Sequence, residues 1–252
     1  MLNKFSIILP VFNGEKTIER AIYSIINQNY PYWELLVIND GSTDGTQQKV
    51  SNLMRQDNRI RMFITPENYE RLISRNIGMR MTRNQWICWI DADDEYFSNY
   101  LEVLNEEISR NPDYGIFNFG AIFKQREIIE GKRYEKGWTI IPPLHLKEEG
   151  EGMESFPSGV MTCGGFIFKK KLLHQRTFFP ETRIPYGDEY SFPALLVQKD
   201  EKFKEICKQD KEGNWLPLGN PFGDDYAFFW WLTRENKSKC LDVILSIHHI
   251  RI

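Results

Sequence analysis

The sequence predicts an α/β protein with a mostly parallel sheet flanked by helices. Two observations carry this prediction. Short apolar runs of strand length alternate with amphipathic runs of helical length over the first hundred residues. Polar, glycine-containing or acidic segments follow three of the apolar runs directly. Alternation of this kind produces parallel strands joined by right-handed helical crossovers.

The expected strands of the first half span residues 5–12, 33–40, 60–66 and 86–91. Helices are expected after Thr17, from about Asp44 to Met54, and over a run that carries Ile73 and Ile77. Further strands are expected at residues 114–124, 164–169 and 240–250. The signal weakens over residues 125–160, where charges, glycines and a Pro-Pro pair indicate a mobile excursion.

Composition excludes several classes of protein. A net charge of −3 supplies no basic field, so no nucleic-acid partner is expected. No apolar run approaches the roughly 20 residues that span a bilayer, and Pro10 interrupts the short run near the N-terminus. The cysteines lack the spacing of a zinc site or a disulfide framework, which favours a cytoplasmic location.

The most informative motif is the acidic cluster Asp91, Asp93 and Asp94, which follows a buried strand. Ligands of open α/β sheets bind at the carboxyl ends of the strands. Neighbouring carboxylates repel one another unless a cation intervenes, and Mg²⁺ or Mn²⁺ prefers oxygen ligands, often shared with substrate phosphates. The alternative is a solvated turn that caps the next helix.

Two further strands end in unusual residues that should lie at the same edge. The first ends at residues 10–14 and the second at residues 39–45, where Asp40 could accept hydrogen bonds from a base or a ribose. Asp40 could bind a neutral donor group, and the acidic pair could bind a cation. Together they would suit a nucleoside diphosphate. The alternative is again structural, with Ser42 or Thr43 capping the following helix.

The motifs ILPVFN, VINDGSTDGT, SRNIGM and WIDADD, in this order and spacing, resemble those of the family 2 glycosyltransferases with the GT-A fold. The resemblance is close over residues 5–100 and looser to about residue 195. It implies a Rossmann-like, mostly parallel sheet with a smaller mixed acceptor-side half. It also implies one GT-A domain over residues 1–252, divided into a nucleotide-sugar-binding half (about 1–112) and an acceptor-binding half (about 113–252).

The resemblance further implies a nucleotide-diphosphate sugar donor and a Mn²⁺ or Mg²⁺ cofactor. Asp93 would be the principal metal ligand, and Asp91 would lie near the ribose and the cation. Residues implied to bind the nucleotide sugar are Pro10, Phe12, Asn13, Asp40, Gly41, Ser42, Arg75, Asp91 and Ala92. One departure concerns the residues before Arg75: relatives have small, glycine-rich residues there, and this chain has Asn68, Tyr69, Glu70 and Arg71.

The catalytic base of the family is an aspartate in an acidic pair at a helix start. Asp188, in YGDEYSF after FFPE, is the first choice because of its separation from Asp93. Asp225, with Asp224, in FGDDY is the runner-up and would require an inserted segment. Either pair can instead interact with a helix dipole.

Two weaker features remain. His248, which with His249 ends the last expected strand, matches a metal-binding histidine of some relatives, although a surface strand end is the simpler interpretation. The aromatic cluster at residues 228–231 is interpreted as core, with an acceptor platform or a peripheral membrane contact as alternatives.

Together these features predict an inverting, metal-dependent glycosyltransferase acting on a saccharide or lipid-linked acceptor, in surface polysaccharide or glycolipid synthesis. It would work in the cytoplasm, with the inner face of the membrane as a further possibility. The oligomeric state is left open. Two alternatives are a catalytically inactive nucleotide-sugar-binding module and a sugar-nucleotide nucleotidyltransferase. The latter would need a glycine-rich loop after the first strand, where this chain has PVFNGEK.

Overall fold

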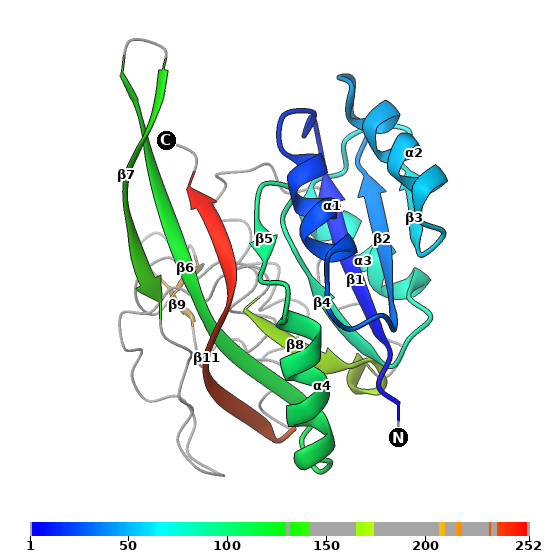
Figure 1. Cartoon of the computed structure of the whole chain (residues 1–252), viewed down its shortest axis with the longest axis vertical. Coiled ribbons are helices and arrows are strands. Elements are labelled where there is room, and N and C mark those ends of the chain that lie inside the picture. Colours follow the sequence, from blue (N-terminus) through cyan, green and yellow to red (C-terminus); the bar gives the residue numbers. More distant parts are fainter. Residues whose placement is uncertain are drawn as a thin grey trace.

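The structure is a computed structural model. It describes residues 2–129, 132–141, 165–173, 207–209, 215–217, 232 and 236–250 (Figure 1). Within them, no helix is long and apolar enough to cross a membrane.

The first half is the predicted parallel sheet. Its strands are β1 (Phe5–Val11), β2 (Trp33–Asn39), β3 (Ile60–Ile64) and β4 (Trp86–Trp89). They lie in the order β3-β2-β1-β4, and all three pairings are parallel. Strands β1, β2 and β4 are buried throughout, as expected when helices cover both faces of a sheet.

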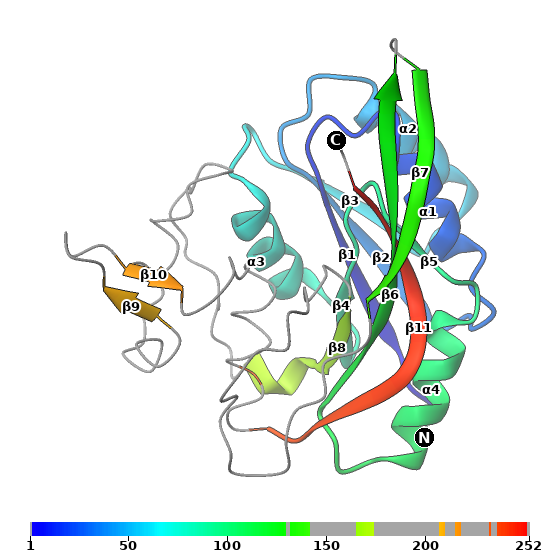
Figure 2. The same ribbon diagram turned by 90° about the vertical axis from the view of Figure 1, so that its left-hand side faces the viewer.

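Four helices flank this sheet: α1 (Ile18–Ile26), α2 (Thr46–Gln56), α3 (Arg71–Met81) and α4 (Tyr100–Arg110). Figure 2 shows α3 on one face and the other three on the opposite face. The apolar stripe predicted for α1 is confirmed, because Ile18, Ala21, Ile22 and Ile25 are all buried.

The sheet continues from β4 into a mixed half. The order proceeds through β8 (Phe166–Lys169), β6 (Ile116–Ile129) and β11 (Ser238–Ile250) to β5 (Glu95–Tyr96), with β7 (Lys132–Ile141) paired to β6. Strands β6 and β11 run parallel, and the other pairings of this half are antiparallel. A short 3₁₀ helix, η1 (Lys170–Leu173), follows β8, and β9 (Cys207–Gln209) pairs with β10 (Trp215–Pro217).

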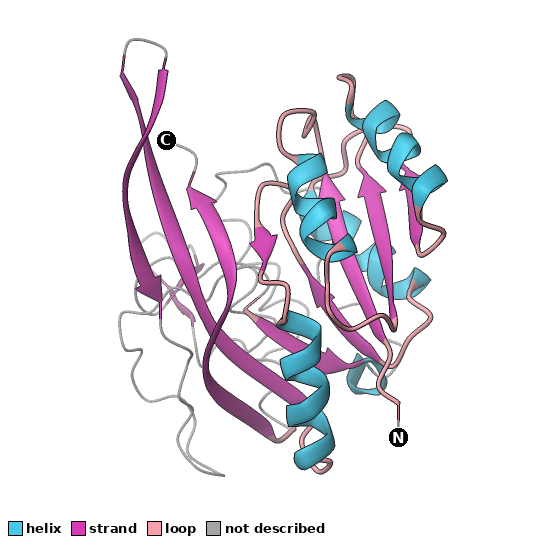
Figure 3. Cartoon of the chain, viewed as in Figure 1, coloured by secondary structure: helices cyan, strands magenta, loops and turns pink. Residues whose placement is uncertain are grey.

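The core follows the sheet across both halves. Trp86 of β4 packs against Phe117 of β6, with ring centroids 5.7 Å apart. Tyr96 of β5 stacks on Tyr100 of α4 at 3.7 Å, and Tyr100 meets Phe119 of β6 edge-on. The contact between Trp86 and Phe117 joins the parallel strands to the mixed strands, which continue the same sheet (Figure 3).

Three sequence expectations are corrected. Residues 125–129 and 132–141, expected to lie in a mobile excursion, form strand segments of β6 and β7. Residues 125–135 are mostly polar or charged in the sequence, so no apolar run marks these strands. His248 and His249 are 6% and 7% exposed rather than at a surface strand end. Helix α2 begins at Thr46, whose main-chain N–H donates to Oδ1 of Asp44 at 3.0 Å and not to Ser42 or Thr43.

Candidate functional site

The turns that follow β1 and β2 are joined at one edge of the sheet. The main-chain N–H of Asp40 donates to the carbonyl of Val11 at 2.8 Å. The N–H of Asn13 donates to Oγ of Ser42 at 2.9 Å, and the N–H of Thr43 donates to Oδ1 of Asn13 at 2.8 Å. Ser42 and Thr43 therefore bind the neighbouring turn instead of capping α2.

Asp40 lies at the end of β2 and is 3% exposed. Its Oδ1 accepts hydrogen bonds from Oγ1 of Thr65 at 3.0 Å and from the N–H of Tyr69 at 2.9 Å. Gly41 has a φ of +70°, and a Cβ on it would lie 2.5 Å from the carbonyl carbon of Glu67. The segment before α3 thus closes over the end of β2 because residue 41 is glycine.

Arg75 and Asp91 meet at the same edge. Arg75 lies on α3 with a fully buried side chain, and its Nη2 is 3.4 Å from Oδ1 of Asp91. The guanidinium also lies 5.1 Å from the ring centre of Trp89, the last residue of β4. The side chain of Asp91 is 34% exposed. In this pair the arginine is therefore buried and the aspartate is accessible.

The acidic turn after β4 packs beside the turn after β1. The N–H of Asp94 donates to the carbonyl of Asp91 at 3.0 Å, which closes the turn. Ala92 is 7% exposed, and its Cβ lies 3.6 Å from the position that a Cβ on Gly14 would occupy. The ends of β1, β2 and β4 therefore share one edge, as the parallel topology predicts.

Asp94 does not share a site with the other two aspartates of the turn. Its Oδ2 lies 2.5 Å from Nδ1 of His248, and its Oδ1 accepts the N–H of His249 at 3.0 Å. Burial raises the pKa of the Asp94 carboxyl, and the contact with His248 opposes that rise. Nε2 of His248 lies 3.2 Å from Oγ of Ser246, so both ring nitrogens already have protein partners.

Asp91 and Asp93 are the residues of this turn that could hold a cation, since both are partly exposed. Within the described part of the chain, no group of three or more histidine, cysteine or acidic residues is placed to hold a metal. Two carboxylates suit a hard cation that takes its remaining oxygens from a phosphate ligand and water. The donor set therefore fits Mn²⁺ or Mg²⁺ bound together with a nucleotide.

Some of the remaining candidate site residues lie within the described part of the chain, and others lie outside it. Pro10 is buried in β1, and Phe12 is 44% exposed at the β1 end. Asp188, Asp224, Asp225 and the aromatic cluster at residues 228–231 lie outside the described residues. Sequence reasoning missed Arg20 and Glu95 and named His249 only as part of a strand end, yet all three contact the acidic turn or its partners. No local pattern signals these contacts, because they join α1, β5 and β11.

The comparison with known protein families agrees with an α/β fold that carries this acidic edge. The family model for glycosyl transferase family 2 matches residues 6–177, which is more than half of the chain. The chain belongs to this family.

The names of two relatives specify sugars that are linked to undecaprenol. The chain is 29% identical over 219 residues to the GalNAc(5)-diNAcBac-PP-undecaprenol beta-1,3-glucosyltransferase of Campylobacter jejuni, covering 82% of this chain and 66% of the relative. It is 37% identical over 124 residues to the UDP-Glc:alpha-D-GlcNAc-diphosphoundecaprenol beta-1,3-glucosyltransferase WfgD of Escherichia coli, covering 49% and 46%. The chain thus spans less than two thirds of WfgD and about two thirds of the Campylobacter enzyme.

Solved structures support the fold. The S. aureus TarS 1–349 structure in complex with UDP-GlcNAc matches with a TM-score of 0.58 at 14% identity, covering 99% of this chain and 59% of the TarS 1–349 chain. The mannosyltransferase PcManGT from Pyrobaculum calidifontis, in complex with GDP-Man and Mn²⁺, matches with a TM-score of 0.50 at 17% identity, covering 72% and 48%. At these identities the likeness establishes the GT-A fold.

Proposed function

We propose that this chain is an inverting, metal-dependent glycosyltransferase that moves a sugar from a nucleotide-diphosphate donor to a saccharide or lipid-linked acceptor. The observation that carries the proposal is the grouping of Asp40, Arg75 and the Asp91–Asp93 turn at the shared end of β1, β2 and β4. Family membership supports the reaction type.

Each residue of the edge has a proposed role toward the donor. Asp40, whose Oδ1 already accepts protein hydrogen bonds, would accept hydrogen bonds from the base or ribose through its other oxygen. Arg75 holds the Asp91 carboxylate in place, because its guanidinium is buried against Trp89 and directed at Asp91. Asp93, with Asp91, would hold the cation. A bound Mn²⁺ or Mg²⁺ would stabilise the negative charge that develops on the departing diphosphate.

The reaction is a single displacement. The acceptor hydroxyl oxygen attacks the anomeric carbon as the bond between that carbon and the diphosphate oxygen breaks. The hydroxyl proton passes to a carboxylate base, and the nucleoside diphosphate leaves with the bonding electrons. One displacement inverts the anomeric centre. Asp188 is the proposed base, with Asp225 or Asp224 as the competing choice.

A lipid-linked acceptor is favoured by the relatives. The names of the Campylobacter and E. coli enzymes both specify undecaprenol-linked sugars. We extend that acceptor class to this chain as part of the proposal. Work at a membrane-bound acceptor would bring the protein to the membrane surface as a peripheral contact.

A ligand screen tests the donor half of the proposal. UDP-, GDP- and TDP-sugars are added with and without Mn²⁺ while the melting temperature is followed. A ligand at a hundred times its Kd stabilises the folded state by about 2.7 kcal/mol. One nucleotide class should raise the melting temperature more with Mn²⁺ than without it. If no nucleotide sugar shifts the melting temperature under either condition, the proposal is wrong.

Turnover then separates transfer from mere binding. Release of nucleoside diphosphate should increase when a lipid-diphosphate sugar acceptor is supplied. A protein that binds the donor but releases no product with any such acceptor would be a binding module instead.

A further inference from the structure

Three side chains connect α1 to β11 through the residues of the acidic turn. Nη2 of Arg20 donates to the main-chain carbonyl of Asp93, and Nε of Arg20 lies 3.2 Å from Oε1 of Glu95. The same Oε1 lies 2.7 Å from Nε2 of His249. We call this connected set, Arg20, Glu95 and His249, the turn bridge.

The bridge acts on the peptide bond that follows Asp93. The carbonyl that receives the Arg20 hydrogen bond belongs to Asp93 itself. Its direction sets the ψ angle of Asp93, and that angle in turn constrains where the carboxylate on the same residue can point. A charged donor makes this hydrogen bond stronger than one between neutral groups.

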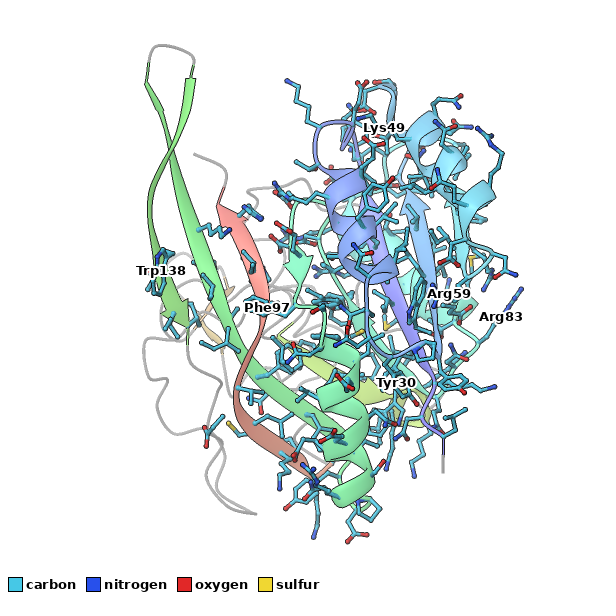
Figure 4. All side chains as sticks on the ribbon, in the orientation of Figure 1. Tyr30, Lys49, Arg59, Arg83, Phe97 and Trp138 are labelled. Carbon is cyan, nitrogen blue, oxygen red and sulfur yellow. The ribbon has the colours of Figure 1, made fainter. Side chains whose placement is uncertain are left out.

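The two residues after Asp93 are held from the side of β11. Asp94 contacts His248 and the N–H of His249, and Glu95 contacts the His249 ring. Main-chain pairing of Glu95 with Ile247 and of Tyr96 with Ser246 continues this attachment. The N–H of Phe97 donates to the carbonyl of Leu245 at 3.0 Å, where the segment meets β11 (Figure 4).

The two acidic residues that follow Asp93 have protein partners of their own. Asp91, Asp93, Asp94 and Glu95 lie within five consecutive positions. Asp94 is occupied by His248, and Glu95 by Arg20 and His249.

We infer that Arg20, Glu95 and His249 are positioning residues that orient the Asp93 carboxylate toward the nucleotide-bound cation. The inference rests on the proposed metal-dependent function and deepens it. These residues do not touch the cation; they act through the Asp93 carbonyl and through Glu95. Partners that orient metal ligands in this way affect metal affinity without being ligands.

The test compares nucleotide binding with and without metal. Isothermal titration measures the Kd of UDP or GDP, whichever the wild type binds, in Mn²⁺ and in EDTA. Arg20→Met should weaken binding in Mn²⁺ by about 10-fold to 100-fold, the usual effect of losing such a partner. Binding in EDTA should stay as in the wild type, because the nucleoside contacts at Asp40 are untouched.

Two variants and one control accompany Arg20→Met. Arg20→Lys keeps the charge and one of the two contacts, so it should recover part of the lost affinity. Glu95→Gln keeps the shape of the turn bridge but removes the negative charge of residue 95. It tests the same inference if Arg20→Met does not fold. Arg110→Met is the matched control, since Arg110 forms exposed ion pairs with Glu106 and Glu107 on α4.

The outcomes separate the inference from the proposed function. If the wild type binds nucleotide equally with Mn²⁺ and with EDTA, the metal part of the proposed function fails and the inference falls with it. If the wild type depends on Mn²⁺ but Arg20→Met binds as the wild type does, only the inference is overturned. Equal losses in Mn²⁺ and in EDTA would also overturn it, because they indicate general damage to the site.

Discussion

The buried guanidinium of Arg75 lies 3.4 Å from the partly exposed carboxylate of Asp91, and this pair joins α3 to the acidic turn. Arg75 comes from the SRNIG stretch and Asp91 from the WIDADD stretch, which the sequence separates. The position of α3 on the sheet therefore determines whether the two motifs meet.

The first prediction concerns Gly78, which sets that position. A Cβ on Gly78 would lie 2.4 Å from Cγ2 of Ile8 in β1. Gly78→Ala should force α3 away from the sheet and lower the free energy of unfolding by about 1–3 kcal/mol, the usual cost of overpacking. Arg75 lies one helical turn earlier, so nucleotide affinity should fall as well. Urea unfolding and isothermal titration measure the two effects.

Gly115→Ala provides the comparison. Its new Cβ would meet the flexible end of Leu172 at 3.0 Å, in the mixed half of the sheet. This variant should cost less stability and leave nucleotide affinity unchanged. A Gly78→Ala protein as stable as the Gly115→Ala protein would contradict the close packing of α3 on β1.

The second prediction concerns pH and Asp57, at the C-terminal end of α2. Its carboxylate accepts hydrogen bonds from Nε and Nη2 of Arg59, at 3.0 and 2.6 Å, and these bonds hold the pKa of Asp57 below its ordinary value of 3.8. A lowered pKa in the folded state gives stability that is present above pH 3.8 and is lost as the pH falls through the folded-state pKa.

Asp57→Asn removes this charge and keeps one of the two oxygens that accept hydrogen bonds from Arg59. It should lower the free energy of unfolding by about 1 kcal/mol at pH 7, a value between those of exposed and buried pairs. The difference between variant and wild type should shrink as the pH falls below 3.8 and through the folded-state pKa of Asp57. A difference that stays constant over this range would show that the carboxylate charge contributes nothing.

The third prediction separates the two candidates for the base. Asp188→Asn should leave donor binding nearly unchanged, because the base acts on the acceptor hydroxyl. Glycosyl transfer should fall by about 10²–10⁴-fold, the usual contribution of a positioned proton acceptor. Asp225→Asn should cost far less. Initial rates with saturating donor and acceptor measure this, and the reverse order of the two effects would identify Asp225 as the base.

The parallel half of the fold could be predicted because its signals are local. The buried strands β1, β2 and β4 appear as apolar runs, and the repeat of apolar residues in α1 marks its buried face. Parallel pairing then places the turns after these strands at one edge, so the placement of Asp40 and Asp91 followed from the sequence.

The rest could not be predicted because it depends on contacts between distant segments. Glu95 and His249 are 154 positions apart, and nothing near either residue indicates that they meet. The sequence places Asp94 in a cation-binding cluster, whereas in the structure Asp94 contacts His248 of β11. From the sequence alone, His248 and His249 are interpreted as a surface strand end. Their burial depends on neighbouring strands and is not visible in the local sequence pattern.

The central claim is that Asp93 is the principal ligand of a nucleotide-bound cation. Nucleotide binding by Asp93→Ala with and without metal tests it most directly. Isothermal titration of UDP and GDP in Mn²⁺ compares this variant with the wild type, and the melting temperature without ligand confirms that the fold is retained. Because Asp93 is the proposed principal ligand, the increase in affinity that Mn²⁺ gives the wild type should be absent from the variant. An Asp93→Ala protein that binds nucleotide with the Mn²⁺ dependence of the wild type would contradict the account.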